Sequence, residues 1–176
     1  MSLLIQYTIL YASVLILVAL GGCFSEHSGV INLGLEGIMV MGALGGALTM
    51  KYMIGYPPAV IVILTILAAA VTGLVFSALL AVACINFKAD QTIVGTALNM
   101  LGLAAATVIV KAINIAENPD NVSATVQYIA QKKSFLVNIG GFEFNWMMLV
   151  ALVILIAAYI VLYKTKFGLR LMACGE

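Results

Sequence analysis

The residue best placed to do chemistry in this sequence is a glutamate inside an apolar stretch. Glu36 lies between Gly34 and Gly37, within an apolar segment that runs from Val30 to Ile54. An ionisable side chain at the centre of a membrane helix costs about 2.5 to 3.5 kcal/mol on insertion scales, so it is expected to face a bundle interior or a water-filled path. The two glycines weaken the helix there, and this favours backbone groups that line a cavity.

Asn32 stands four residues before Glu36, so both side chains share one face if the backbone between them is helical. We therefore take Asn32 and Glu36 as candidates for a polar path. The alternative is that Glu36 is a structural residue near the membrane surface, where its carboxylate accepts hydrogen bonds from backbone amides.

A second candidate is a line of polar side chains in a later apolar segment. Thr92, Thr96 and Asn99 recur at i, i+4 and i+7, which places all three on one stripe of a helix. Such a stripe suits a pathway that must solvate a polar solute. The alternative is that the threonine hydroxyls donate to carbonyls of their own helix.

No pattern in the sequence predicts a catalytic residue, a metal site or a cofactor. The chain has one histidine, His27, and it lacks the G-x-S-x-G, H-E-x-x-H and phosphate-loop motifs. Cys23, Cys84 and Cys174 share no C-x-x-C spacing, so we interpret them as packing residues. An intramembrane enzyme would need a partner for Glu36 that the sequence does not show.

Composition defines the elements that must position these residues. Of 176 residues, 64% are hydrophobic and 9% are charged, whereas soluble domains carry about 25% charged residues. The net charge of +1 argues against nucleic-acid binding. We predict an all-α, polytopic transmembrane helical bundle, a single domain over residues 1–176, with about five spans: Leu3–Phe24, Val30–Ile54, Ala59–Phe87, a segment ending near Ile115, and Trp146–Tyr163.

The ends of these segments bear on processing, loops and orientation. Leu20 to Cys23 resembles a lipoprotein cleavage box, but no charge precedes Glu26, so we expect a retained span. We expect residues 117–143 to form an extramembrane loop and residues 164–176 a short basic segment. With five spans, four basic residues fall on each side of the membrane, so the positive-inside rule does not decide the orientation.

Three ordered stretches, Ala19–Gly37, Ala89–Asn99 and Thr165–Glu176, carry a resemblance to a known family. They resemble the permease subunits of bacterial ABC importers for nucleosides and simple sugars, in the group that includes ribose and branched-chain amino acid permeases. The resemblance implies a bacterial cell-membrane protein whose partners are an ABC ATPase, a second permease subunit, an extracytoplasmic substrate-binding lipoprotein and the lipid bilayer.

The resemblance also implies that residues 164–176 start a cytoplasmic loop that contacts the ATPase. This places the C-terminal end inside and the N-terminus outside. The coupling candidates on this segment are Phe167, Gly168, Leu169, Arg170, Gly175 and Glu176. An amphipathic tail that lies on the lipid headgroups is the alternative for the same residues.

The sequence departs from the family in three respects. Members continue past the glycine-glutamate pair into further spans, so we expect this chain to be the N-terminal part of a permease. His27 and Met172 stand where relatives often carry basic residues.

Nucleosides, simple sugars and branched-chain amino acids all remain candidate substrates. The alternative from another functional class is an autonomous small carrier or channel.

Overall fold

The structure, a computed structural model, describes residues 2–126, 136–139 and 142–175. These residues form six helices and one two-stranded hairpin. Their contacts group them into two compact units, one made of residues 1–32 and 135–176 and the other of residues 33–134. The helical bundle predicted from composition is confirmed.

The unit of residues 33–134 is built from α2 (Leu35–Tyr52), α3 (Pro58–Ile85) and α4 (Gln91–Glu117). Proline at the first position of α3 needs no hydrogen-bond partner for its nitrogen and already has a helical φ. Asp90 caps α4 by accepting hydrogen bonds from the amides of Thr92 and Ile93 at 2.8 and 3.2 Å. Local sequence signals therefore fix where both helices begin.

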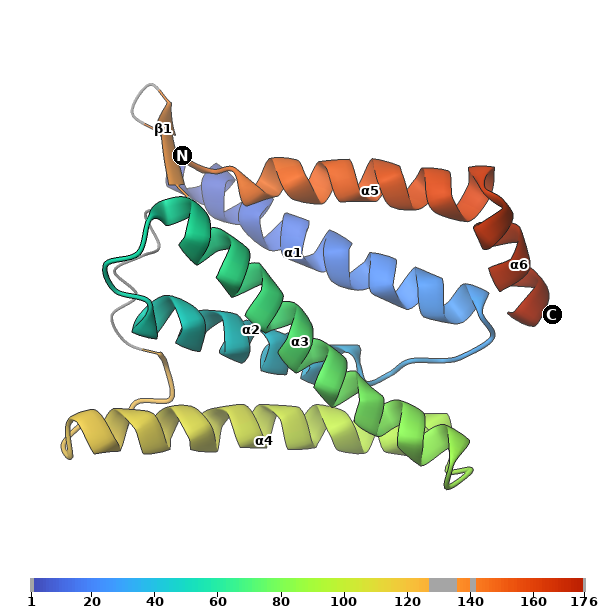
Figure 1. The fold of residues 1–176 in the computed structure, drawn as a ribbon, viewed down its shortest axis with the longest axis horizontal. Helices are drawn as coiled ribbons and strands as arrows, with labels where there is room; N and C mark the ends of the chain where they lie inside the picture. The colour runs from blue at the N-terminus through green and yellow to red at the C-terminus, as the bar shows by residue number, and fades with distance from the viewer. Residues whose placement is uncertain (1, 127–135, 140–141, 176) are drawn as a thin grey trace. The chain divides into compact units, whose positions relative to one another are not determined.

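Helix α2 packs against both α3 and α4 in this unit (Figure 1). A Cβ on Gly42 would lie 3.2 Å from the Ala69 carbonyl oxygen, and one on Gly46 would lie 3.4 Å from the Ala69 Cβ. The G-x-x-x-G pair is therefore a packing face toward α3. Two apolar clusters fill the unit: Leu44, Ala106 and Val110, and Phe76, Leu80 and Leu98.

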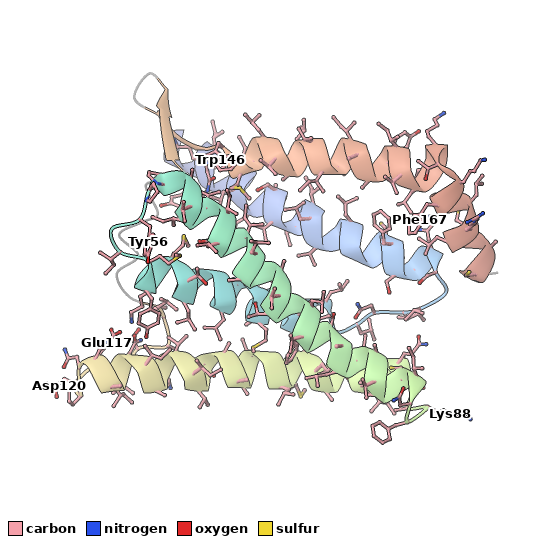
Figure 2. The ribbon with its side chains drawn as sticks, viewed as in Figure 1. Tyr56, Lys88, Glu117, Asp120, Trp146 and Phe167 are labelled. Carbon is pink, nitrogen blue, oxygen red and sulfur yellow. The ribbon has the colours of Figure 1, made fainter. Side chains whose placement is uncertain are left out.

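Several charged residues of this unit lie at or just beyond the ends of its helices. Figure 2 shows Lys88 in the turn between α3 and α4, and Glu117 and Asp120 at the far end of α4. Lys51, at the end of α2, forms an ion pair of 2.7 Å with Glu117. The start of α2 lies against the first half of α4, so the two helices run parallel, with α3 antiparallel between them in sequence.

The other unit contains α1 (Ser2–His27), β1 (Leu136–Ile139), β2 (Phe142–Asn145), α5 (Met147–Lys164) and α6 (Lys166–Gly175). The strands pair antiparallel, with Leu136 opposite Asn145 and Ile139 opposite Phe142. Helices α1 and α5 lie side by side (Figure 1). Predicted loop 117–143 therefore contains the last residue of α4 and most of this hairpin.

Four described helices are long and apolar enough to cross a membrane: α1 from Leu4, α3, α4 and α5. Helix α2 is not among them. It has 18 residues, with Glu36 in its first turn and Lys51 in its last. A helix of that length extends about 27 Å, close to the hydrocarbon thickness of about 30 Å, so its charged ends can reach the two membrane surfaces.

The directions of α1 and α5 indicate that α2 also crosses. Ile9 and Met148, near the starts of α1 and α5, line one cavity. The rings of His27 and Tyr163, at the two helix ends, lie 6.1 Å apart. The helices therefore run parallel, and two parallel spans require an odd number of crossings between them. Helices α3 and α4 supply two, so we infer that α2 is the third.

Asn32 lies before α2, which begins at Leu35, so the backbone from Asn32 to Glu36 is not continuously helical and the condition for a shared helical face is not met. Residues 166–175 of the predicted basic segment form helix α6. Phe167 and Leu169 are therefore about 200° apart around the helix axis and do not belong to one apolar face.

Candidate functional site

The start of α2 is held on α4 by the side chain of Asn99. The Asn99 Oδ1 accepts a hydrogen bond of 2.8 Å from the amide of Gly37, and the Nδ2 donates one of 2.6 Å to the Leu33 carbonyl. Gly34, the N-cap residue of α2, has no side chain to do this. Asn99 therefore satisfies one of the free amides that every helix start leaves without an intrahelical partner.

Glycine lets the two helices approach closely enough for these bonds. A Cβ on Gly102 would lie 2.9 Å from both the Cα and the carbonyl oxygen of Gly37. One on Gly95 would lie 3.0 Å from the Gly34 nitrogen and from the Leu33 Cβ. Gly37, Gly95 and Gly102 are buried, so backbone packs directly on backbone along this contact.

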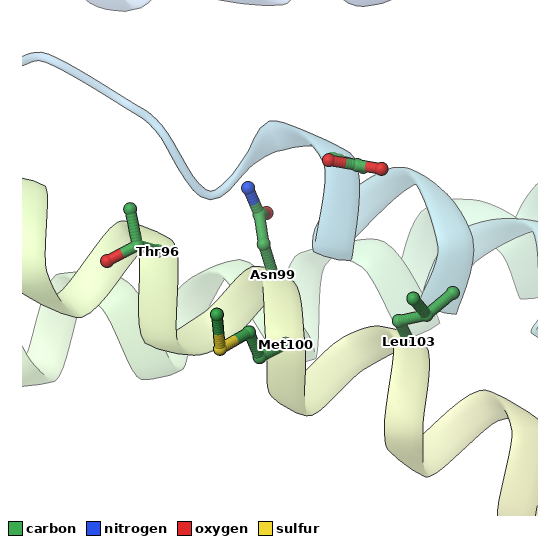
Figure 3. A pocket seen from close by; sticks show the side chains of 5 residues that line it. Thr96, Asn99, Met100 and Leu103 are labelled. Carbon is green, nitrogen blue, oxygen red and sulfur yellow. The ribbon is translucent and has the colours of Figure 1, made fainter.

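A cavity of about 300 Å³ opens beside this contact (Figure 3). A volume of this size is at the lower end of the range for small-molecule sites, about 300 to 1,000 Å³. Its lining comes from the first turn of α2 and from one face of α4: Glu36, Thr96, Asn99, Met100 and Leu103. Three of the five predicted path residues therefore lie together.

The polar side chains of the cavity differ in which of their hydrogen-bonding atoms are already engaged within the protein. The Thr96 hydroxyl lies 3.0 Å from the Thr92 carbonyl oxygen and 2.9 Å from that of Ile93, so its proton is used within its own helix. Both polar atoms of the Asn99 amide are engaged by backbone. The Glu36 side chain is exposed and has no hydrogen bond or ion pair to any described residue.

The other two predicted path residues lie elsewhere. Thr92 is exposed at the start of α4, one turn before Thr96, and does not line the cavity. Asn32 belongs to the segment that precedes α2. Thr92, Thr96 and Asn99 form a helical stripe as predicted, but only Thr96 and Asn99 line the cavity.

The predicted coupling residues lie on α6, which is amphipathic. Phe167, Leu171 and Cys174 recur at i, i+4 and i+7 on one side, and the basic residues Arg170 and Lys166 follow along one edge of that side. Phe167 is exposed (Figure 2).

Glycines hold α6 to the rest of its unit. Gly168 is buried against the Leu162 backbone. A Cβ on Gly175 would lie 2.7 Å from the His27 carbonyl oxygen and 2.8 Å from the Gly29 nitrogen. Glu176, the last predicted coupling residue, lies outside the described residues.

Sequence reasoning missed Asn114, which is 1% exposed. Its Nδ2 donates to the carbonyls of Ser123 and Thr125, each at 2.9 Å, and so holds the chain that follows α4 against the helix. An asparagine in the last turns of an apolar helix was the available signal. In the described part of the chain, no cluster of three or more potential metal ligands occurs, and the prediction of no metal site rests on the sequence.

Comparison with known proteins identifies the chain's relatives. Residues 4–176 match the family model described as the permease component of branched-chain amino acid transport systems. The chain belongs to this permease family. Two permeases align with its whole length: a guanosine ABC transporter permease of Bacillus subtilis, 38% identical over 182 residues, and a nucleoside ABC transporter permease of Lactococcus lactis subsp. cremoris, 33% identical over 180 residues.

A third relative of this permease is the putative glucose ABC transporter permease of Haloferax volcanii, 37% identical over 108 residues, which cover 59% of the chain and 30% of the relative. The chain spans about half the length of the guanosine and nucleoside permeases that it matches, 56% of each. No solved structure gives a significant match to it. Family membership and its apolar helices make it a multi-pass membrane protein.

Proposed function

We propose that the chain forms part of the membrane-spanning subunit of an ATP-driven importer for nucleosides. The observation that carries this proposal is the alignment of the whole chain with permeases named for guanosine and nucleoside transport. The cavity beside the α2–α4 contact supports it, because a polar solute needs hydrogen-bonding groups along its way through an apolar bundle.

In this proposal Glu36, Thr96 and Asn99 border the translocation path, with Asn32 and Thr92 near its ends. Glu36 contributes a carboxylate whose oxygens are available to the solute. Asn99 positions α2, and with it Glu36, through its bonds to Gly37 and Leu33. Met100 and Leu103 supply the apolar wall against which a base or a sugar ring would pack.

ATP hydrolysis belongs to a partner ATPase in this proposal, and α6 is the part of the chain that contacts it. Exposed Phe167 and Leu169 and the basic side chain of Arg170 would be covered by that partner. Gly168 and Gly175 keep α6 close to α5 and to the end of α1. The N-terminus is then outside and α6 cytoplasmic. A second permease subunit and a substrate-binding lipoprotein complete the transporter.

Simple sugars are the second candidate substrate, because one relative is named as a putative glucose permease. Branched-chain amino acids are the third, from the description of the family. All three classes share the need for a polar path, so the cavity alone does not select among them.

The test is uptake by a complete permease that carries this sequence, reconstituted in proteoliposomes with its ATPase and binding protein. We expect ATP-dependent uptake of labelled guanosine. Unlabelled nucleosides should inhibit this uptake by competition, and glucose and leucine should not. Competition by glucose alone would move the assignment to sugars. Uptake by the permease without the ATPase would show that the protein is an autonomous carrier and not part of an ATP-driven importer.

A further inference from the structure

The polar side chains that line the α2–α4 cavity offer a solute more hydrogen-bond acceptors than donors. An ionised carboxylate accepts hydrogen bonds and donates none, so Glu36 offers two acceptor oxygens. The Thr96 hydroxyl gives its proton to its own helix and retains lone pairs toward the cavity. Asn99 uses its oxygen and one amide hydrogen on the backbone of residues 33 and 37. A solute that enters must therefore supply most of the donors.

Building on the function proposed above, we propose that Glu36 selects solutes that present two adjacent hydrogen-bond donors to its carboxylate. A carboxylate binds such a pair through two parallel bonds, which are stronger and more directional than neutral ones. Nucleosides carry this chemistry in two places. The N1–H and 2-amino groups of guanine form one pair, and the 2′- and 3′-hydroxyls of ribose form the other.

The position of Glu36 supports this role. It lies in the first turn of α2, where the helix dipole favours negative charge. It is exposed in a cavity whose other wall, Met100 and Leu103, is apolar. No described residue pairs with its carboxylate, whereas Glu117, which lies at the other end of the α2–α4 pair, forms an ion pair with Lys51.

The experiment measures ATP-dependent uptake of guanosine, inosine and 2′,3′-dideoxyinosine by the reconstituted transporter, with wild-type permease and with Glu36→Gln. Inosine lacks the 2-amino group, and dideoxyinosine lacks the ribose hydroxyl pair as well. Glutamine retains one acceptor and presents a donor in place of the other. Glu36→Asp, which keeps the carboxylate, and Glu26→Gln, which neutralises a glutamate of α1 outside the cavity lining, are the matched controls.

If Glu36 contacts the base, Glu36→Gln lowers the ratio of guanosine to inosine uptake by about tenfold, the effect of a charge-assisted hydrogen bond of about 1.5 kcal/mol. If it contacts the ribose, guanosine and inosine uptake fall together while that of dideoxyinosine is unchanged. Either result supports the proposal. An equal fall for all three nucleosides, or no fall for any, overturns it. A wild-type transporter that takes up none of them would instead contradict the proposed function.

Discussion

At the scale of single residues, Asn99 and Glu36 have different roles although both line one cavity. Both polar ends of Asn99 bond to the backbone of the α2 start, at 2.8 and 2.6 Å. The carboxylate of Glu36 bonds to no described residue. A side chain that makes hydrogen bonds to buried backbone groups contributes mainly to stability. A side chain whose acceptor atoms are free can bind the solute.

We therefore expect Asn99→Ala and Glu36→Ala both to reduce uptake, but by different routes. Asn99→Ala leaves the buried Gly37 amide without its partner, at a cost of about 1 to 3 kcal/mol, and should lower the melting temperature of the purified permease. Glu36→Ala should leave that temperature unchanged. Thermal unfolding in detergent, measured beside uptake, distinguishes the two.

Thr96→Val is the matched control for Asn99→Ala. The Thr96 hydroxyl bonds only to carbonyls of its own helix, so its loss should change the melting temperature little. If Asn99→Ala proved as stable as Thr96→Val, Asn99 would not hold α2 in the way described.

At the scale of secondary structure, α6 is the element whose prediction the structure changed most. Phe167, Leu169 and Leu171 alternate along the sequence, and in an extended chain they would lie on one side. In the helix, Phe167 and Leu171 share a side, while Leu169 lies on another. A docking surface on α6 can therefore use one of these sides without the other.

We expect Phe167→Asp with Arg170→Glu to uncouple ATP hydrolysis from transport while membrane insertion is retained. The double change puts a negative charge on the apolar side of α6 and reverses the charge of Arg170 at the edge of that side. Co-purification of the ATPase and substrate-stimulated hydrolysis, at normal permease levels, are the measurements. Leu169→Asp, on another side of α6, is the comparison. Undiminished ATPase association in the double variant would show that α6 is not the docking element.

At the scale of the whole molecule, the number of crossings depends on α2. Four described helices are long and apolar enough to cross a membrane, and the parallel pair of α1 and α5 requires an odd number of crossings between them. Five crossings put the α2–α3 turn and the α3–α4 turn on opposite sides of the membrane. They also place the two ends of the described chain on opposite sides.

Labelling with a membrane-impermeant maleimide tests this topology. In a cysteine-free background, Tyr56→Cys, in the α2–α3 turn, should react from outside, and Phe87→Cys, in the α3–α4 turn, only from the cytoplasm; both native side chains are exposed. In the same background, an added N-terminal cysteine should react from outside, and a restored Cys174 should react from the cytoplasm. If the N-terminal cysteine and Cys174 react from the same side, the five-span topology is wrong.

The sequence by itself determined the class of protein, the approximate positions of its five long helices and its family. Apolar runs of membrane length, the proline pair at the start of α3 and the aspartate that caps α4 are local signals, and they act within a few residues of their own positions. The helical stripe of Thr92, Thr96 and Asn99 follows from the helix period alone.

Only the tertiary structure decided what those side chains contact. Residues 33 and 37 meet Asn99 more than sixty positions away in the chain, through a close approach that depends on Gly37 and Gly102 at once. The partners of Asn114 and of Lys51 likewise depend on how the chain folds back. Helix period fixes the face on which a residue lies, but packing between helices fixes its partner, because that partner belongs to another segment of the chain.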